Sequence, residues 1–199
     1  MVIDGIYYAL GCLAAGGAIS YFSRPVWAIP LVILALFCLY FFRDPDRVVP
    51  SGPVAVSPAD GKVVAVKPEG AGKRVSIFLN VFDVHVNRSP ISGRITEVRY
   101  QAGEFLVASR EEASTRNEMN TVTVEGERTR VVFSQIAGLI ARRIVFQKKP
   151  GDQVAAGERV GMIKFGSRVD VHFGPEWAVS VSEGERVAAG SSVLARRKS

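Results

Sequence analysis

Cysteine and histidine are scarce in this chain of 199 residues, which contains two of each. Cys12 and Cys38 both lie in apolar stretches without metal-ligand spacing, so they indicate packing residues and argue against a disulfide framework. The sequence has no cluster with metal-site spacing and no glycine loop of the kind that cradles phosphates. It also lacks an RNA-binding aromatic motif and a DNA-reading helix signature, so we expect neither a metal nor a nucleic-acid partner.

Charge is absent from two N-terminal segments, Gly5–Phe22 and Val26–Phe42, which are separated by Ser23-Arg24-Pro25. As a helix, the 17 residues of the second segment would span roughly 25 Å, just short of a hydrocarbon core, and we expect it to be the stronger membrane segment. The first segment is rich in Gly and Ala and suits a closely packed helix. We favour a helical hairpin that returns to the same side, with a single span and a cleaved signal peptide as alternatives.

Positive charge marks the end of this region. Arg43 and Arg47 follow the second segment, which predicts a cytoplasmic location for the rest of the chain, although Arg24 in the connecting turn argues mildly against it. The net charge of +6 is carried by the C-terminal part and favours an anionic membrane surface as partner. We therefore expect membrane-anchoring segments at 1–42 and a second domain at 43–199.

The second domain shows the pattern of short strands broken by Gly and Pro. Val63–Val66, Val75–Leu79 and Thr121–Val124 are β-rich, and Glu125-Gly126-Glu127 fits a hairpin turn. Helical periods between the strands are missing, which argues against a parallel βαβ sheet. The stretch Phe105–Glu118 is the main candidate for a helix or irregular segment.

An internal repeat refines this picture. Gly151–Val160 recurs as Gly184–Val193, 33 residues later, and Pro58–Val64 is a looser copy. These units resemble the hammerhead turns of lipoyl- and biotinyl-carrier domains. The resemblance implies a mainly β, barrel-sandwich-hybrid-like fold. Carrier domains hold a lysine in the hairpin between the repeats, whereas here that interval contains Gly166 and Ser167.

A Gly-Ser pair is common in turns, so Gly166-Ser167 taken alone indicates a turn serine before a strand. The functional alternative is self-processing, in which the Ser167 hydroxyl attacks the Gly166 carbonyl and converts the peptide bond into an ester. Elimination of the carboxylate leaves a dehydroalanyl terminus, and hydration with loss of ammonia gives a pyruvoyl group. Glycine supplies an unhindered carbonyl and tolerates a strained turn.

That chemistry needs a base, and Asp83 and His85 are the candidates. On a strand, residues two apart share a face, so the carboxylate could orient the imidazole. The alternative is a buried, hydrogen-bonded histidine beside a surface aspartate. His172 indicates an ordinary strand histidine, although it shares a face with Asp170 and a pocket role stays open.

Arg142, Arg143, Lys148 and Lys149 form a basic patch just before the first repeat. A solvated face is the ordinary interpretation of such a patch. The alternative is contact with lipid phosphates, which suits arginine.

Five motifs occur in an order that matches a known family. They are Phe-Phe-Arg-Asp-Pro-Asp-Arg at 41–47, Ser-Pro-Ala-Asp-Gly at 57–61, Asn-Val-Phe-Asp-Val-His-Val-Asn-Arg-Ser-Pro at 80–90, Ala-Arg-Arg-Ile at 141–144 and Lys-Phe-Gly-Ser-Arg at 164–168. With these motifs the chain resembles the short, pyruvoyl-dependent phosphatidylserine decarboxylases.

The resemblance implies decarboxylation of phosphatidylserine to phosphatidylethanolamine in phospholipid biosynthesis, through a Schiff base with a pyruvoyl group at Ser167. It implies cleavage between Gly166 and Ser167 into associated chains 1–166 and 167–199, with no metal and no pyridoxal phosphate. Ser167, His85 and Asp83 are then the catalytic candidates. Arg88, Arg142 and Arg143 are candidates for substrate contact, and a homo-oligomer stays open.

The chain departs from the family pattern in two places. The longer enzymes carry a further histidine assigned to self-cleavage, but this chain has none between His85 and His172, and Met119 replaces an arginine in an Asn-Glu-Arg-Asn-like motif. The competing hypotheses are a non-catalytic, membrane-tethered carrier or binding module, a pyruvoyl enzyme acting on a soluble amino acid, and a decarboxylase of the archaeal ether-lipid analogue, archaetidylserine.

Overall fold

The computed structural model describes residues 2–106, 112–138, 143–164 and 166–198. Its contacts divide the chain into two compact units, Met1–Asp46 and Arg47–Ser199. Each unit is described by itself.

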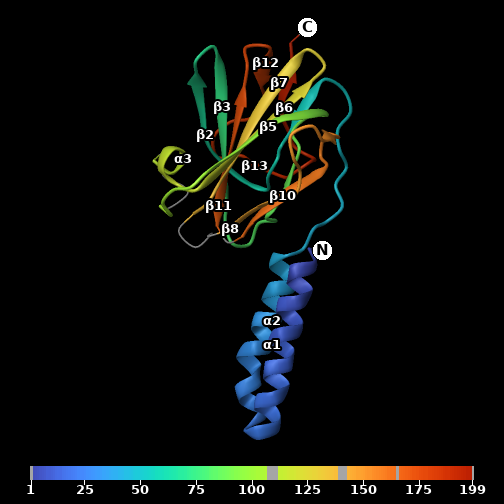
Figure 1. Cartoon of the computed structure of the whole chain (residues 1–199), viewed down its shortest axis with the longest axis vertical. Coiled ribbons are helices and arrows are strands. Elements are labelled where there is room, and N and C mark those ends of the chain that lie inside the picture. Colours follow the sequence, from blue (N-terminus) through green and yellow to red (C-terminus); the bar gives the residue numbers. More distant parts are fainter. Residues whose placement is uncertain (1, 107–111, 139–142, 165, 199) are drawn as a thin grey trace. The chain divides into compact units, whose positions relative to one another are not determined.

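The first unit is a pair of helices, α1 (Ile3–Phe22) and α2 (Ile29–Phe41), joined through the 3-10 turn η1 (Pro25–Ala28) (Figure 1). The two helices run antiparallel: the N–H of Val2 donates to the carbonyl of Phe42 (2.9 Å), while Gly16 lies against Ala28 near the other end. A Cβ at Gly5 would lie only 2.4 Å from Phe42 Cβ, so glycine permits the close approach at the Phe42 end. The helical hairpin expected from the two uncharged segments is therefore present.

The relative lengths of the two helices differ from the sequence expectation. Among the described residues only α1, with 20 residues, is long and apolar enough to cross a membrane, whereas α2 has 13 residues. At about 1.5 Å per residue they measure roughly 30 and 20 Å. The expectation that Val26–Phe42 is the stronger segment was wrong, because η1 takes up its first residues and leaves Pro30 in the first turn of α2.

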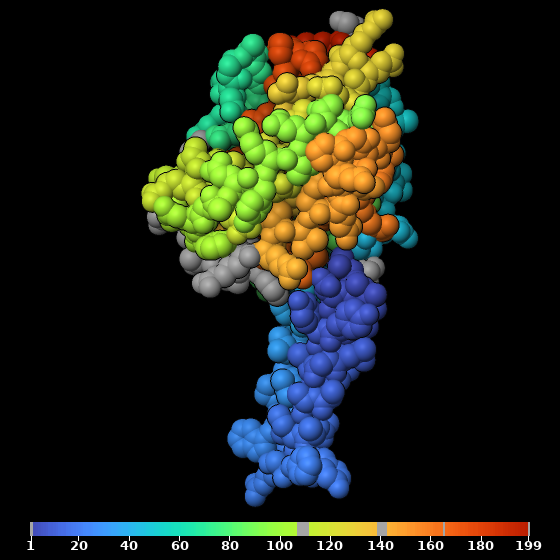
Figure 2. All heavy atoms as spheres, in the orientation of Figure 1, coloured from blue at the N-terminus to red at the C-terminus, as the bar shows by residue number. Residues whose placement is uncertain are grey.

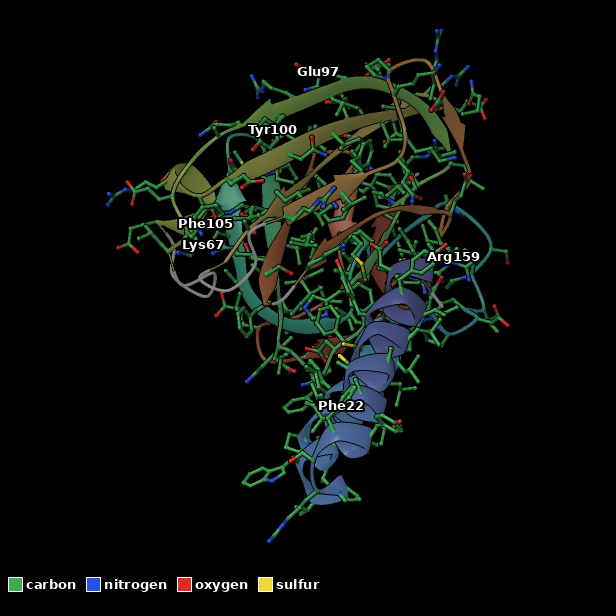
Figure 3. All side chains as sticks on the ribbon, turned by 60° about the horizontal axis from the view of Figure 1, so that its bottom comes forward. Phe22, Lys67, Glu97, Tyr100, Phe105 and Arg159 are labelled. Atoms are coloured by element: carbon green, nitrogen blue, oxygen red, sulfur yellow. The ribbon has the colours of Figure 1, made fainter. Side chains whose placement is uncertain are left out.

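Apolar side chains cover the outside of this helical pair. Tyr7, Phe22, Trp27 and Ile33 are all more than half exposed, and Figure 3 labels Phe22 among them. A helix that is hydrophobic all round is typical of a membrane environment. The exposed surface therefore supports membrane association of residues 3–41.

The second unit is built almost entirely of strands. In chain order they are β1 (Val54–Val56), β2 (Gly61–Glu69), β3 (Gly72–Leu79), β4 (Val86–Arg88), β5 (Gly93–Gln101), β6 (Met119–Gly126), β7 (Thr129–Ile136), β8 (Arg143–Phe146), β9 (Gln153–Val154), β10 (Arg159–Lys164), β11 (Ser167–Phe173), β12 (Trp177–Val179), β13 (Arg186–Val187) and β14 (Val193–Arg197). The β6–β7 hairpin turns after Gly126, as its sequence predicts.

These strands form one large curled sheet and two small ones, all with antiparallel pairing. The large sheet has the order β13-β2-β3-β11-β7-β6-β5-β9, and the small sheets have the orders β1-β14-β12 and β4-β10-β8. Figure 1 shows β11 in the middle of the large sheet, between β3 and β7. The curled arrangement confirms the mainly β, barrel-sandwich-like class.

One hydrophobic core fills the inside of the curl. Alternate residues of β3, β7 and β11 contribute to it, among them Ile77, Phe133 and Val169, all fully buried. Leu194 of β14 and Ile163 of β10 close it from the small sheets. On β11 the core face carries residues 167, 169, 171 and 173, because side chains alternate along a strand.

The internal repeat is a structural repeat. Gly151 and Gly184 have φ of +101° and +94°, and Gly157 and Gly190 both have φ of +75°, a region that favours glycine. The hydrogen bonds repeat as well: Gly157 N–H donates to the carbonyl of Ser89, and Gly190 N–H donates to that of Ser57, each at 2.8 Å. The two copies therefore pair with equivalent Ser-Pro turns.

The Phe105–Glu118 stretch contains a short helix, α3 (Ala113–Arg116), and irregular chain. Glu104 bridges to Asn117, and the side chain of Asn117 donates to the carbonyls of Leu106 and Ala137 (2.8 and 2.7 Å). Residues 107–111 lie outside the described part of the chain. In Figure 2 this segment, in yellow-green, lies at one side of the β-rich unit.

Candidate active site

Ser167 is the first residue of β11, and its side chain faces the core side of the large sheet. It is fully buried, and in the described part of the chain its Oγ has no hydrogen-bond partner. A buried hydroxyl without a partner costs free energy, on the order of 1–3 kcal/mol. Such an unsatisfied group in a folded protein needs an explanation, and a catalytic role is one.

Gly166 precedes it in a left-handed turn with φ of +64°. A Cβ at this position would meet no atom within 4 Å, so glycine is favoured by the backbone conformation and not by lack of space. The sequence expectation of a tight glycine turn at this bond is confirmed. Phe165 lies outside the described residues.

His85 contacts this turn directly. Its Nε2 accepts a hydrogen bond from the backbone N–H of Gly166 (3.2 Å), and its Nδ1 lies 2.9 Å from the carbonyl oxygen of Asp83. A carbonyl can only accept, so Nδ1 carries the proton and Nε2 presents a lone pair. The fold therefore places the unprotonated nitrogen of a fully buried histidine beside the Gly166–Ser167 bond.

Asp83 reaches the imidazole through its backbone and not through its carboxylate. The carboxylate accepts the N–H of Asn80 (2.9 Å) and forms an ion pair with Arg186. The expected strand is absent here, because β3 ends at Leu79, the side chain of Asn80 caps the N–H of Phe82, and β4 begins only at Val86. Asp83 thus lies in a bend and His85 in the irregular residues just before β4, so the idea that they share a strand face was wrong.

A buried chain of amides holds the strand that follows His85. The side chain of Gln135 donates to Asn87 Oδ1 (2.8 Å) and accepts from Asn120 Nδ2 (3.0 Å). All three residues are almost fully buried, and they belong to β7, β4 and β6. Satisfied buried networks of this kind specify one arrangement, so they fix β4 and, with it, the position of His85.

His172 lies on the other face of β11 from Ser167. Its Nδ1 is 2.9 Å from Glu69 Oε2, and its side chain is about one-third exposed. Asp170 shares this outer face with it, as the sequence predicts. The fold therefore brings His85, and not His172, to the Gly166–Ser167 turn.

The arginines proposed to contact the substrate differ in their exposure to solvent. Arg88 is buried and its Nη1 donates to the carbonyl of Gly157 (2.9 Å), whereas Arg143 is exposed at the start of β8. Arg142 lies outside the described residues. Substrate contact by these arginines stays a prediction.

Lys148, from the predicted basic patch, pairs with Glu158 at 2.6 Å. The hydrogen bond from Lys148 lowers the pKa of the Glu158 carboxyl, and the same bond raises the pKa of the Lys148 ammonium. Lys148 therefore serves an internal contact.

The sequence did not reveal which side chains link the two Ser-Pro turns to the two glycine repeats. Asp60 accepts from Arg47 (2.8 Å) and from the N–H of Ala189 (2.7 Å), and Ser92 Oγ accepts the N–H of Ala156 (2.9 Å) in the equivalent place. The available signal was the recurrence of Ser-Pro-x-x-Gly at 57–61 and 89–93. Both copies turn toward a glycine repeat and accept a backbone N–H from it.

Residues 34–195 match the family model described as phosphatidylserine decarboxylase. The chain belongs to the phosphatidylserine decarboxylase family. A phosphatidylserine decarboxylase proenzyme of Solibacter usitatus (strain Ellin6076) is 68% identical over 197 residues, which cover 99% of this chain and 97% of that protein.

Two further relatives carry the same name. The phosphatidylserine decarboxylase proenzyme of Nitrosomonas eutropha (strain DSM 101675 / C91 / Nm57) is 44% identical, over 96% of this chain and 93% of its own. The phosphatidylserine decarboxylase proenzyme of Oleidesulfovibrio alaskensis (strain ATCC BAA-1058 / DSM 17464 / G20) is 47% identical, over 94% of this chain and 90% of its own. The decarboxylase family thus accounts for the chain from the helical unit to the last strand.

Proposed function

We propose that this protein is a proenzyme that cuts itself between Gly166 and Ser167 and then decarboxylates phosphatidylserine to phosphatidylethanolamine. The observation that carries the proposal is the buried Ser167 Oγ, which has no hydrogen-bond partner among the described residues and follows a left-handed Gly166 whose N–H donates to His85 Nε2. Membership of the phosphatidylserine decarboxylase family indicates which reaction this site catalyses, the decarboxylation of phosphatidylserine.

Self-processing begins when Ser167 Oγ bonds to the Gly166 carbonyl carbon and the Gly166–Ser167 C–N bond breaks, leaving an ester and a free amine. His85 Nε2 is the base for the hydroxyl proton once it releases the Gly166 N–H. Loss of the residue 167 α-proton then expels the Gly166 carboxylate. One water converts the resulting enamine, through its imine form, into a ketone and ammonia.

The residues present fit a pyruvoyl group at this place. When formed, that group supplies a carbonyl that condenses with the substrate amine and withdraws electrons as carbon dioxide leaves. β3 holds residue 167 through its pairing with Leu79, and the buried surroundings exclude water. His85 contacts the turn itself and is the candidate proton carrier.

The two chains stay associated after the cut. β11 pairs along its length with β3 and β7, β13 pairs with β2, and β14 pairs with β1. In each pair the partner strand comes from residues 1–166. Buried Val169, Val171 and Leu194 add apolar contacts in the shared core.

The helical unit tethers the enzyme to the bilayer that contains its substrate. The apolar exterior of α1 and α2 supports this role, and the Lys and Arg residues that follow them favour the cytoplasmic side. Protease added outside intact spheroplasts should leave the β-rich unit uncut. Ready digestion from outside would reverse this orientation.

Intact-mass measurement of the purified protein tests the processing. The expected result is one chain ending at Gly166 and one of 33 residues, Ser167 to Ser199, whose N-terminus is blocked by a pyruvoyl group. Ser167→Ala should stay uncut and inactive, while Ser167→Cys should still cut, since a thiol can make the same acyl shift. An active enzyme that remains a single chain would refute the proposal.

A further inference from the structure

Arg168, the residue after the proposed cleavage bond, is a deeply buried charged side chain. It is 1% exposed, although it faces away from the core on β11, opposite Ser167. Its Nε donates to Asp170 Oδ1 (2.6 Å) and its Nη2 donates to Ser76 Oγ (2.7 Å). The guanidinium thus contacts a residue of its own strand and a residue of β3.

Asp170 extends these contacts to residues of the other future chain. Its second oxygen accepts from Ser114 Oγ of α3 (2.7 Å) and lies 3.6 Å from Arg74 Nη1. Asp170 is also 1% exposed. Arg168 and Asp170 belong to residues 167–199, whereas Arg74, Ser76 and Ser114 belong to 1–166, so the cluster crosses the boundary that cleavage creates.

Burying an ion pair is a poor way to gain stability, because desolvation of both charges offsets their attraction. What a buried and fully hydrogen-bonded pair can do is specify position. The position that needs to be fixed here is that of residue 167. This residue pairs with only one neighbouring strand: it pairs with Leu79 of β3, whereas the pairing of β11 with β7 begins one residue later, at Arg168 and Ile136.

We propose that Arg168, Asp170, Ser76 and Ser114 form a clamp that positions residue 167 after the chain is cut. Before cleavage, Gly166 holds Ser167 from the other side. Afterwards residue 167 is a chain end, and its placement depends on Arg168, its covalent neighbour. This inference rests on the proposed function, since it assigns positioning residues to the same site.

The test compares Arg168→Met, Arg168→Lys and Ser76→Ala with a matched control, Arg99→Met, which changes an exposed arginine on β5. For each purified protein, the pyruvoyl content is measured by intact mass, and kcat is expressed per pyruvoyl group. Misplacement of a reacting group by about 1 Å can cost on the order of a hundredfold in rate. We therefore expect Arg168→Met to lose at least roughly tenfold in kcat per pyruvoyl with little change in KM, and Arg168→Lys to recover part of the loss.

A purely structural role would lower the yield of cut protein and leave kcat per pyruvoyl unchanged, and that result would overturn the clamp. If Arg168→Met fails to fold, Ser76→Ala decides, because it removes one hydrogen bond and leaves the ion pair in place. Unchanged kcat per pyruvoyl in Ser76→Ala would then reject the proposal, and a loss of threefold or more, about 0.65 kcal/mol, would support it. An uncut or inactive wild type would instead be a failure of the proposed function.

Discussion

The backbone N–H of Gly166 donates a hydrogen bond to Nε2 of His85 across 3.2 Å, although 81 residues separate them in the chain. The other ring nitrogen, Nδ1, donates a hydrogen bond to the carbonyl oxygen of Asp83, so Nε2 is the acceptor. The bond that links these residues also restrains the peptide to be cut. Under the proposed function, self-cleavage would therefore begin from a geometry in which the base and the scissile bond are already together.

Replacing His85 by Ala should slow self-cleavage by roughly 10²–10⁴-fold, the usual worth of general acid–base assistance. His172→Ala is the matched control and should cleave almost normally, because His172 lies on the opposite face of β11. The readout is the rate of chain cutting on denaturing gels, with folding checked by circular dichroism. A stalled His172→Ala together with a normal His85→Ala would show that the base is misassigned.

Gly166→Ala should slow cleavage by roughly tenfold, because an L-residue in the left-handed region costs about 1–2 kcal/mol. Gly166→Asn should be milder, since asparagine tolerates this conformation. A Cβ meets no atom within 4 Å, so crowding cannot explain a loss. Equal rates for Gly166→Ala and wild type, from the same gel assay, would show that the turn conformation is not limiting.

Asp83→Asn should affect cleavage less than Asp83→Ala. The amide oxygen of asparagine can still accept the Asn80 N–H that shapes the turn, and the ring contact comes from the backbone carbonyl, which both variants retain. Asp83→Asn loses the ion pair with Arg186, but the Arg186 side chain is 63% exposed, so its charge stays hydrated without the pair. Cleavage rates that fall equally in both variants would instead mean that the negative charge is required.

The two chains produced by cleavage should co-elute in size-exclusion chromatography under reducing, non-denaturing conditions. β11 lies between two strands of the longer chain, and the only cysteines, Cys12 and Cys38, are both in that chain. Separation should require denaturant, and the isolated 33-residue chain should show no strand signal by circular dichroism. Release of the short chain in native buffer would contradict the interleaved strand order.

Removing residues 1–42 should give a more soluble protein that still cuts itself, since the site lies wholly within the β-rich unit. A longer truncation through Val48 also removes Arg47, which pairs with Asp60 at 2.8 Å. Loss of a hydrogen bond to a charged group costs about 1.5–3 kcal/mol, so the second truncation should be less stable to urea. Identical midpoints for the two truncated proteins would show that Arg47 contributes nothing to stability.

Much of the protein follows from local patterns in its sequence. The absence of charge from Gly5–Phe22 and Val26–Phe42 predicted the helical hairpin, and turn residues between β-rich runs predicted the class of the second unit. The recurrence of Gly151–Val160 as Gly184–Val193 predicted its barrel-sandwich character. These features depend on residues near one another in the chain, which is why composition and spacing sufficed.

Other features needed the tertiary structure, because they join residues that are distant in sequence. The turn at Asn80–His85 was hidden by an alternating pattern, and its side-chain hydrogen bonds replaced the strand that the pattern predicted. Arg168 donates to Ser76 of β3, and Arg186, near the end of the chain, pairs with Asp83. The sequence by itself determined which chemical groups are present and the kind of fold that carries them. Long-range strand pairing decided that His85 Nε2 meets Gly166 and that Arg168 is buried on the opposite face of β11 from Ser167.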